Sequence, residues 1–355
     1  MFWYLFLAAS PIVLMPIVSS YYNTPIDSNN KAKKTYLFWC GLILFLMIAL
    51  RDKSLGSVDS TNYYNNWIKL REMPFDKLPA FMEKSDMESG YLFTVWCISR
   101  IFYEPQFVFV LSGLLFSIAV CQTIYFNSEN VMLSMVMYIC LGLYMFMLQG
   151  LRQSIAISIC LLATEHCKKR KFFPFLLSML LAFLFHRTCI VFTIMYFVYG
   201  LKFTSKTKAG LLITAGVLVL LAPLFVKYGN QFLDRAYENT AQSSALIASA
   251  IYVIILAVAY LFLDKKNTNE ELMFFIVMTL FGAAFYLMRY MGAQVMDRIS
   301  FYFIMGQNIV LPAVIKKFDN KSKDIIIFVV CGLCILLFLY RLATSYGIVY
   351  LFFWQ

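Results

Sequence analysis

Long apolar runs separated by short polar stretches constrain this chain more than any other feature. They fall at about residues 2–19, 35–50, 107–126, 131–149, 152–167, 172–185, 188–201, 209–226, 246–263, 271–290, 297–315 and 325–342. A transmembrane helix needs about 20 mainly apolar residues, whereas a strand of a membrane barrel needs about 9–11. Most of the runs are too long for strands. We therefore predict an all-α polytopic membrane protein with about 12 transmembrane helices, forming a single integral membrane domain over residues 1–355.

The composition excludes a soluble protein. The chain is 61% hydrophobic and 14% charged, whereas soluble domains are about half apolar and a quarter charged. The first run lacks a basic flank and a small-residue cleavage site, so we interpret it as a first span rather than a signal peptide. A further run at about 91–104 is interrupted by Ser99, Arg100, Glu104 and Pro105. We expect a re-entrant or interfacial segment there, with a full crossing as the alternative.

Lysine and arginine segregate along the chain. If alternate loops face opposite sides, one side holds 15 of the 20 lysines, including Lys168, Lys169 and Lys171, and the other holds nine of the 10 arginines. The positive-inside rule makes the lysine side cytoplasmic. Loops 51–90 and 227–245 are then extracytoplasmic. The net charge of +11 lies in short loops between spans, which favours the lipid bilayer and polyanionic lipid substrates as partners and argues against nucleic acid.

The first polar cluster follows the second apolar run. Arg51 ends that run, Gly56 permits a turn, and Asp59 and Tyr63 lie one helical turn apart. One interpretation is an anion-binding arginine beside a carboxylate that accepts a proton or holds sugar hydroxyls. The alternative is an arginine that reaches the membrane surface, with Asp59 capping a helix that starts at Ser60.

Two further polar groups border apolar runs on the predicted outer side. Glu88 precedes the 91–104 run, where it either caps a helix or acts as a base whose pKa is raised by apolar surroundings. Arg152 and Gln153 begin one run, and His186 ends the next. Because charge near lipid is expensive, such residues generally face a cavity or a partner. Histidine also exchanges protons at physiological pH.

The last polar group lies between two apolar runs near the C-terminus. Arg289 ends one run, and Asp297, Arg298 and Tyr302 begin the next. The two arginines suit a phosphate clamp, because guanidinium groups bind two oxygens at once. The alternative is a structural salt bridge to Asp297. Arg235, in the second outer loop, is a candidate to close over the site.

Metal chemistry has little support in the sequence. The chain has two histidines, which excludes a histidine-rich zinc site, and no D-x-D carboxylate pair stands out. Cys331 and Cys334 have a redox spacing, but they lie in the middle of an apolar run, which favours inert buried cysteines. We therefore expect no metal and no cofactor.

Taken together, these motifs resemble the EpsG-like, Wzy-type bacterial polysaccharide polymerases. The resemblance covers roughly residues 36–303 and depends on the order and spacing of short motifs. They are Arg51 followed by Gly56, Asp59 and Tyr63; Glu88-Ser89-Gly90-Tyr91; Leu151-Arg152-Gln153-Ser154-Ile155-Ala156; Ala182-Phe183-Leu184-Phe185-His186; and Arg298-Ile299-Ser300-Phe301-Tyr302-Phe303.

The resemblance implies a metal-independent glycosyltransferase of the bacterial cytoplasmic membrane, with a GT-C-like fold and its active site on the periplasmic side. Such an enzyme joins oligosaccharide repeat units carried on undecaprenyl diphosphate, which serve as donor and acceptor, for O-antigen of lipopolysaccharide, capsule or exopolysaccharide. A chain-length regulator is a candidate further partner. The alternatives are a lipid-linked oligosaccharide flippase, which charge within a membrane also suits, and an O-antigen ligase.

The chemistry that we expect is an inverting transfer with undecaprenyl diphosphate as the leaving group. Fixed cations stabilise such a leaving group, and Arg152, Arg289 and Arg298, with Arg51, are the candidates. A base must take the proton of the attacking hydroxyl. The candidates for this base, in order, are His186, Glu88 and Asp59.

Overall fold

The computed structural model describes residues 1–355 except 56–57, 225–242, 265, 267, 291–294 and 347–348. The described residues form helices and no strand, apart from one isolated antiparallel bridge between Arg51 and Phe352. The all-α prediction is therefore confirmed. The helices are α1 (Phe2–Tyr22), η1 (Ile26–Ser28), α2 (Asn30–Ala49), α3 (Val58–Glu72), η2 (Phe75–Lys77), α4 (Leu78–Lys84), α5 (Ser89–Ser99), α6 (Phe107–Asn127), α7 (Val131–Cys140), α8 (Leu143–Gln149), α9 (Leu151–Lys168), α10 (Phe172–Phe185), η3 (Arg187–Thr193), α11 (Ile194–Val198), α12 (Ser205–Leu220), α14 (Ser243–Phe262), α15 (Glu270–Tyr290), α16 (Val295–Ser300), α17 (Met305–Ile315), α18 (Asn320–Arg341) and η4 (Leu342–Tyr346).

Among the described residues, six helices are long and apolar enough to cross a membrane. The number is seven if α7 and α8, which meet at 47°, form one bent span. Further apolar helices over 172–185, 187–198, 249–262 and 305–315 are shorter. Several spans are thus supported, while the count of twelve and the GT-C-like fold stay predictions.

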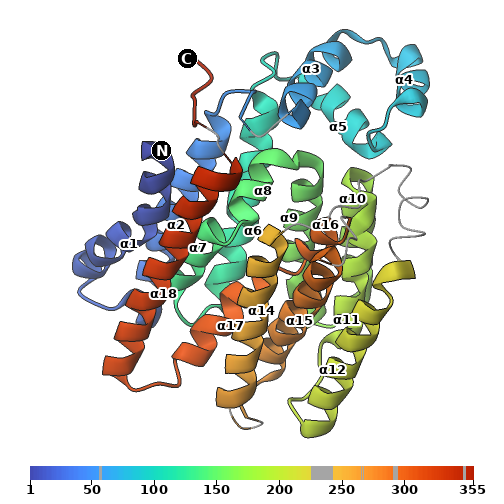
Figure 1. The fold of residues 1–355 in the computed structure, drawn as a ribbon. Coiled ribbons are helices and arrows are strands. Elements are labelled where there is room, and N and C mark those ends of the chain that lie inside the picture. Colours follow the sequence, from blue (N-terminus) through green and yellow to red (C-terminus); the bar gives the residue numbers. More distant parts are fainter. Residues whose placement is uncertain (56–57, 225–242, 265, 267, 291–294, 347–348) are drawn as a thin grey trace.

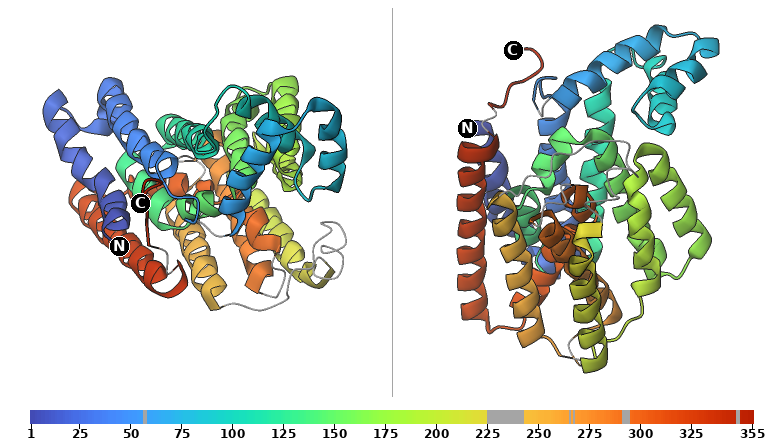
Figure 2. Two further views of the ribbon diagram at one scale, coloured as in Figure 1. Left: turned by 90° about the horizontal axis from the view of Figure 1, so that it is seen from above. Right: turned by 45° about the vertical axis from the view of Figure 1, so that its right-hand side comes forward.

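The long helices lie side by side, and α3, α4 and α5 sit together at one end of them (Figures 1 and 2). Helix α5 has 11 residues, so it rises about 17 Å and cannot cross a hydrocarbon layer of about 30 Å. An apolar cluster that includes Trp67, Tyr91, Phe109 and Leu151 joins α3 and α5 to α6 and α9. The 91–104 segment therefore begins as a short helix at the end of the bundle, and its residues 100–104 lie outside that helix.

The opposite end of the bundle, which we call the lysine end, gathers the lysine-rich loops. Lys316 pairs with Glu129 at 2.6 Å, and Lys168 pairs with Glu271 at 3.3 Å. These contacts join loops that are far apart in the sequence. The end with α3–α5, which carries the polar clusters described below, is called the arginine end. The predicted segregation of lysine from arginine is thus seen in the fold, and which end faces the cytoplasm stays a prediction.

Four of the helices that start at the lysine end have side-chain caps. The residues that cap α2, α7, α12 and α18 are Asn29, Asn130, Thr204 and Asp319, and each side chain accepts a hydrogen bond from the first turn of its helix. Such caps satisfy backbone N–H groups that lack a helical acceptor. They fix where these four helices begin.

Candidate active site

A break between two helices places the first site residues at the arginine end. Helix α8 ends at Gln149 and α9 begins at Leu151. A Cβ atom on Gly150 would lie 2.7 Å from the ring of Phe146, so a larger residue there would displace that ring. Arg152 and Gln153 therefore occupy the first turn of α9. The backbone N–H groups of this turn have no helical acceptor and carry the positive end of the helix dipole.

A second break places the histidine. Helix α10 ends at Phe185, and His186 has extended backbone angles (φ −160°, ψ 118°) before the 3₁₀ helix η3 starts at Arg187. The turn takes the His186 side chain out of the α10 helix surface. Its imidazole is half-buried and reaches the cap at α5.

The glutamate reaches this histidine because α5 and α10 approach very closely. A Cβ atom on Gly90 would lie 2.4 Å from Cβ of Leu184 and 2.6 Å from its carbonyl oxygen. Any larger residue at position 90 would push the start of α5 away from α10. Glu88, which directly precedes α5, is thereby held against the end of α10. The close contact explains the glycine in the Glu88-Ser89-Gly90-Tyr91 motif.

One carboxylate links three parts of the chain. Oε1 of Glu88 lies 2.8 Å from Nδ1 of His186. Its second oxygen accepts a hydrogen bond from the guanidinium of Arg152. Arg152 also donates, through Nε, to the hydroxyl of Tyr63 at 3.5 Å. Four residues that the sequence predicted for the site are thus brought together.

These contacts determine the protonation states of Glu88 and His186. Burial by itself would raise the pKa of Glu88, but the hydrogen bond from His186 and the charge of Arg152 lower it to about 2. Burial lowers the pKa of His186 below its ordinary 6.5, with Glu88 opposing this. At neutral pH the carboxylate is therefore ionised and the imidazole is neutral. A neutral imidazole that donates from Nδ1 to Glu88 carries its lone pair on Nε2.

A cavity of about 160 Å³, which we call the polar cavity, lies beside this group. It is lined by Asp59, Tyr63, Phe146, Gln149, Gly150, Arg152, Gln153, His186 and Arg298. Two atoms of lining residues, His186 Nε2 and Gln153 Oε1, are buried without a hydrogen-bond partner in the described part of the chain. Buried polar atoms of this kind are normally satisfied. Since both residues line the cavity, a polar ligand bound there is a candidate partner for these atoms.

Of the described residues in the 289–298 segment, one lines the polar cavity. Gln153 donates through its side-chain amide to the backbone carbonyl of Arg298, which ties α16 to the first turn of α9. Arg298 lines the cavity. Arg289 does not line it and instead pairs with Asp297 at 3.3 Å. The geometry therefore favours Arg298 as the arginine that faces a ligand, and a structural salt bridge for the other two.

Arg51 does not line the polar cavity. It is completely buried, with its guanidinium 4.1 Å from the centre of the Phe109 ring. The guanidinium donates to the carbonyls of Leu55, at 2.7 Å, and Leu148, and to the Ser60 hydroxyl at 3.3 Å. Leu148 lies in the last turn of α8, where carbonyls lack helical donors. These contacts favour a structural role for Arg51 over the phosphate contact that we expected.

The remaining predicted residues divide into three cases. Asp59 lines the polar cavity from the first turn of α3. Tyr302 is completely buried and its hydroxyl lies 3.1 Å from that of Thr188, so it does not reach the cavity. Glu88 lies behind His186 rather than in the lining. Arg235 lies outside the described residues.

Two lining residues were not expected from the sequence. Gln149 is a polar residue at the end of an apolar run, directly before Gly150. This position could have predicted it as a site residue. Phe146 stacks on Phe301, with ring centroids 4.0 Å apart. Nothing in the sequence distinguishes it from the other phenylalanines.

In the part of the chain that the structure describes, no three His, Cys, Asp or Glu side chains are grouped as metal ligands would be. The nine cysteines are all described and none forms a disulfide. Metal independence stays a prediction.

Comparison with known proteins identifies the family. No curated protein and no solved structure matches the chain. The model of the EpsG family matches residues 34–354, which is nearly the whole chain and includes every residue of the polar cavity. This match confirms the resemblance found in the motifs. The protein therefore belongs to the EpsG family of Wzy-like membrane proteins related to polysaccharide polymerases.

Proposed function

We propose that this protein is an inverting polymerase that joins oligosaccharide repeat units carried on undecaprenyl diphosphate, and that it acts at the outer face of the bacterial cytoplasmic membrane. Family membership supports a polymerase role. The observation that carries the chemistry is the unpartnered Nε2 of His186, buried beside a cavity and backed by an ionised carboxylate. This arrangement suits a general base.

The transfer step needs a base for one proton. The acceptor hydroxyl oxygen attacks the anomeric carbon of the donor sugar, and a new glycosidic C–O bond forms. His186 Nε2 takes the hydroxyl proton. The bond from the anomeric carbon to the diphosphate breaks, and undecaprenyl diphosphate leaves with the electron pair. Glu88 holds the tautomer of His186 and stabilises the imidazolium that forms, as a carboxylate does behind a catalytic histidine.

The leaving diphosphate needs positive charge. Arg298 and Arg152 line the polar cavity, and the first turn of α9 directs its N–H groups and helix dipole to the same place. Fixed donors of this kind are worth about two to three orders of magnitude in rate each. Arg152 shares its charge with Glu88, and Arg298 adds a second guanidinium at the cavity wall.

The remaining polar groups of the cavity wall bind sugar hydroxyls in this proposal. Asp59 and Gln153 offer oxygen acceptors at the cavity wall, and Tyr63 offers a ring and a hydroxyl. The cavity volume of about 160 Å³ is below the roughly 300–1,000 Å³ of sites for drug-sized ligands. It holds the reacting groups, while the rest of the glycan lies along neighbouring surfaces. The proposal includes metal independence and a GT-C-like arrangement of about 12 spans.

Cells that lack the protein separate the candidate functions. Loss of a polymerase leaves single repeat units on lipid outside the cytoplasm, loss of a ligase leaves unattached polymer, and loss of a flippase leaves units on the cytoplasmic side. Wild-type protein should restore long chains and His186→Ala should not. Arg187→Ala is the matched control, because Arg187 is adjacent but exposed and outside the cavity lining. Unattached polymer or cytoplasmic units in the deletion strain would overturn the proposal.

A further inference from the structure

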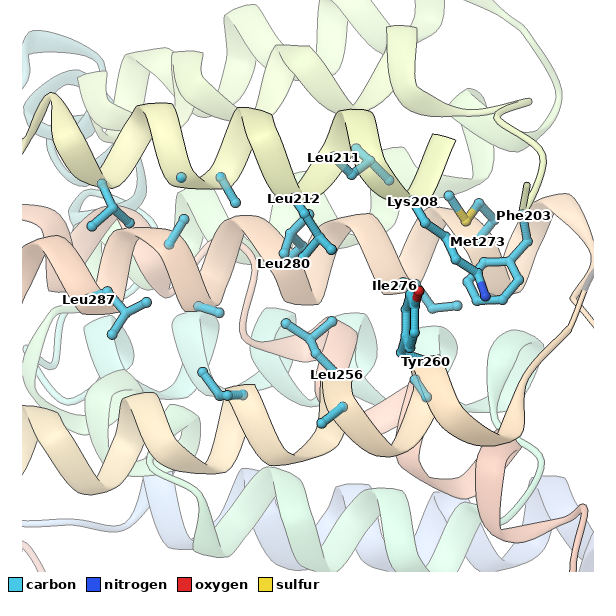
Figure 3. A pocket seen from close by; sticks show the side chains of 18 of the residues that line it. Phe203, Lys208, Leu211, Leu212, Leu256, Tyr260, Met273, Ile276, Leu280 and Leu287 are labelled. Carbon is cyan, nitrogen blue, oxygen red and sulfur yellow. The ribbon is translucent and has the colours of Figure 1, made fainter. Parts of the chain in front are cut away.

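An apolar cavity of about 780 Å³ lies between α12, α14 and α15 (Figure 3). We call it the α12–α15 groove. Its lining side chains are apolar except for Lys208 and Tyr260. Helix α12 buries none of its residues, so the groove is open along one wall of the bundle. An apolar channel between membrane helices suits a hydrocarbon chain.

The length of the groove distinguishes between hydrocarbon chains. On α15 it is lined from Met273 to Leu287, and those residues appear at opposite ends of Figure 3. Fourteen residues of helix rise about 21 Å. One leaflet of a bilayer is about 15 Å of hydrocarbon, half of the full core. The groove is therefore longer than the hydrocarbon of one leaflet is thick, which suits a chain longer than the acyl chain of a phospholipid.

The groove also starts at the height of the candidate site. Leu287 lies two residues before Arg289, which pairs with Asp297, and the next residue, Arg298, lines the polar cavity. The end of the groove at Leu287 and the polar cavity are thus linked through one ion pair and one peptide bond. This proximity favours the lipid of the substrate over a bulk lipid.

A cation lines the far end of the groove. The ammonium of Lys208 lies 3.9 Å from the centre of the Phe203 ring and 4.4 Å from that of Tyr260. Such contacts hold a lysine over aromatic faces. They place a polar stop at the lysine end, so the groove accepts a chain that enters from the arginine end.

From these observations we propose that the α12–α15 groove binds the polyprenyl chain of the lipid carrier, a proposal that rests on the proposed function. The chain runs from the polar cavity along α15 toward Lys208. The diphosphate at the cavity and the tail in the groove together hold the carrier in one orientation. Substrates with long carriers then gain binding that short prenyl chains do not.

Two glycines of α12 give a matched pair of variants. A Cβ atom on either Gly216 or Gly210 would meet nothing within 4 Å, so a larger side chain fits both positions. Gly216 lines the groove and Gly210 does not. Gly216→Phe therefore fills the groove, and Gly210→Phe adds the same side chain to the same helix outside it.

The direct test is photo-crosslinking in nanodiscs with undecaprenyl diphosphate that carries a diazirine near the end of its chain. Wild type and Gly210→Phe should be labelled on α12, α14 or α15 peptides. Gly216→Phe should lose about tenfold of this labelling, since excluding about two methylenes costs about that much affinity. Labelling elsewhere, or equal labelling of both variants, overturns the proposal that the groove binds the polyprenyl chain. So does labelling by a diazirine phospholipid that undecaprenyl diphosphate does not displace.

A kinetic experiment tests the role of the groove independently of the proposed polymerase function. With a repeat unit on a long polyprenyl chain, Gly216→Phe should lower kcat/KM about tenfold. With the same repeat on a geranyl chain it should match wild type. An equal loss of kcat/KM on both substrates overturns the proposal that the groove binds the polyprenyl chain. If groove peptides are labelled but the wild type makes no polymer from either substrate, the groove stands and the polymerase proposal fails.

Discussion

The imidazole of His186 and the carboxylate of Glu88 lie 2.8 Å apart, although 98 residues separate them in the chain. The contact fixes which ring nitrogen carries the proton and leaves Nε2 as the acceptor beside the polar cavity. A carboxylate that the sequence offered as an alternative base thus acts through the histidine. Glu88 is a positioning residue in this account.

The first prediction concerns pH. Because the pKa of His186 is below 6.5, the neutral form predominates at pH 7, and polymerisation should fall as acid protonates it, with a midpoint below 6.5. Glu88 stays ionised throughout, since its pKa is about 2. Glu88→Gln removes the charge that raises the pKa of His186. Its acid limb should shift to lower pH, and kcat should fall about 10²–10⁴-fold. A smaller kcat with an unmoved pH profile would contradict the positioning role.

The second prediction concerns the close approach of α5 to α10. Gly90→Ala forces a Cβ atom against Leu184, which should cost about 1–3 kcal/mol of stability. It should also shift Glu88 from His186 and lower kcat/KM about 100-fold. Ser89→Ala is the control, because Ser89 is exposed and its change should leave both quantities near wild type. Thermal unfolding in detergent and polymer yield measure the two effects. A fully active Gly90→Ala would show that this contact does not position the glutamate.

Arg152 should be needed for chain growth. Arg152→Ala should abolish long glycan chains while leaving single lipid-linked units, with a loss of about two to three orders of magnitude in rate. Arg152→Lys should not restore them, because one ammonium does not reproduce the donors that reach Glu88 and Tyr63 together. Gel analysis of glycan from cells with equal protein levels tests this. Normal chains from a well-expressed Arg152→Ala would defeat the role.

Arg51 should behave differently from Arg152. Its guanidinium satisfies buried acceptors on Leu55, Leu148 and Ser60, so Arg51→Lys should lower the free energy of unfolding by about 2 kcal/mol or more. The folded fraction should keep a kcat near that of wild type. The two quantities are separated by thermal unfolding and by rates normalised to folded protein. A large fall in kcat at unchanged stability would restore the phosphate contact first expected for Arg51.

The sequence predicted the site better than it predicted the contacts within the site. Arg152, His186 and Arg298 were identified as polar residues at the ends of apolar runs. A charged side chain near lipid is energetically costly, so such residues generally face a cavity or a partner. The role of Arg51 was not readable, since its acceptor on Leu148 exists only because the helix breaks at Gly150. The Glu88–His186 contact likewise depends on how closely α5 packs on α10. Such packing is set by the whole fold rather than by local spacing.

The helical class followed directly from the apolar runs, whereas the number of spans did not. Segments such as 172–185 and 305–315 form apolar helices shorter than a straight crossing needs. Their composition resembles that of a span, but their length suits tilted, broken or partial crossings equally well. The 91–104 run was ambiguous for the same reason, and its packing on α3 resolved it.

The most direct test of the account is polymerisation by purified protein in nanodiscs, supplied with one synthetic repeat unit on undecaprenyl diphosphate. We predict a ladder of products from wild type and from Arg187→Ala. His186→Ala should give no ladder and yet bind undecaprenyl diphosphate as tightly as wild type does. A ladder from His186→Ala at the wild-type rate would contradict the account, as would the absence of any product from the wild-type protein.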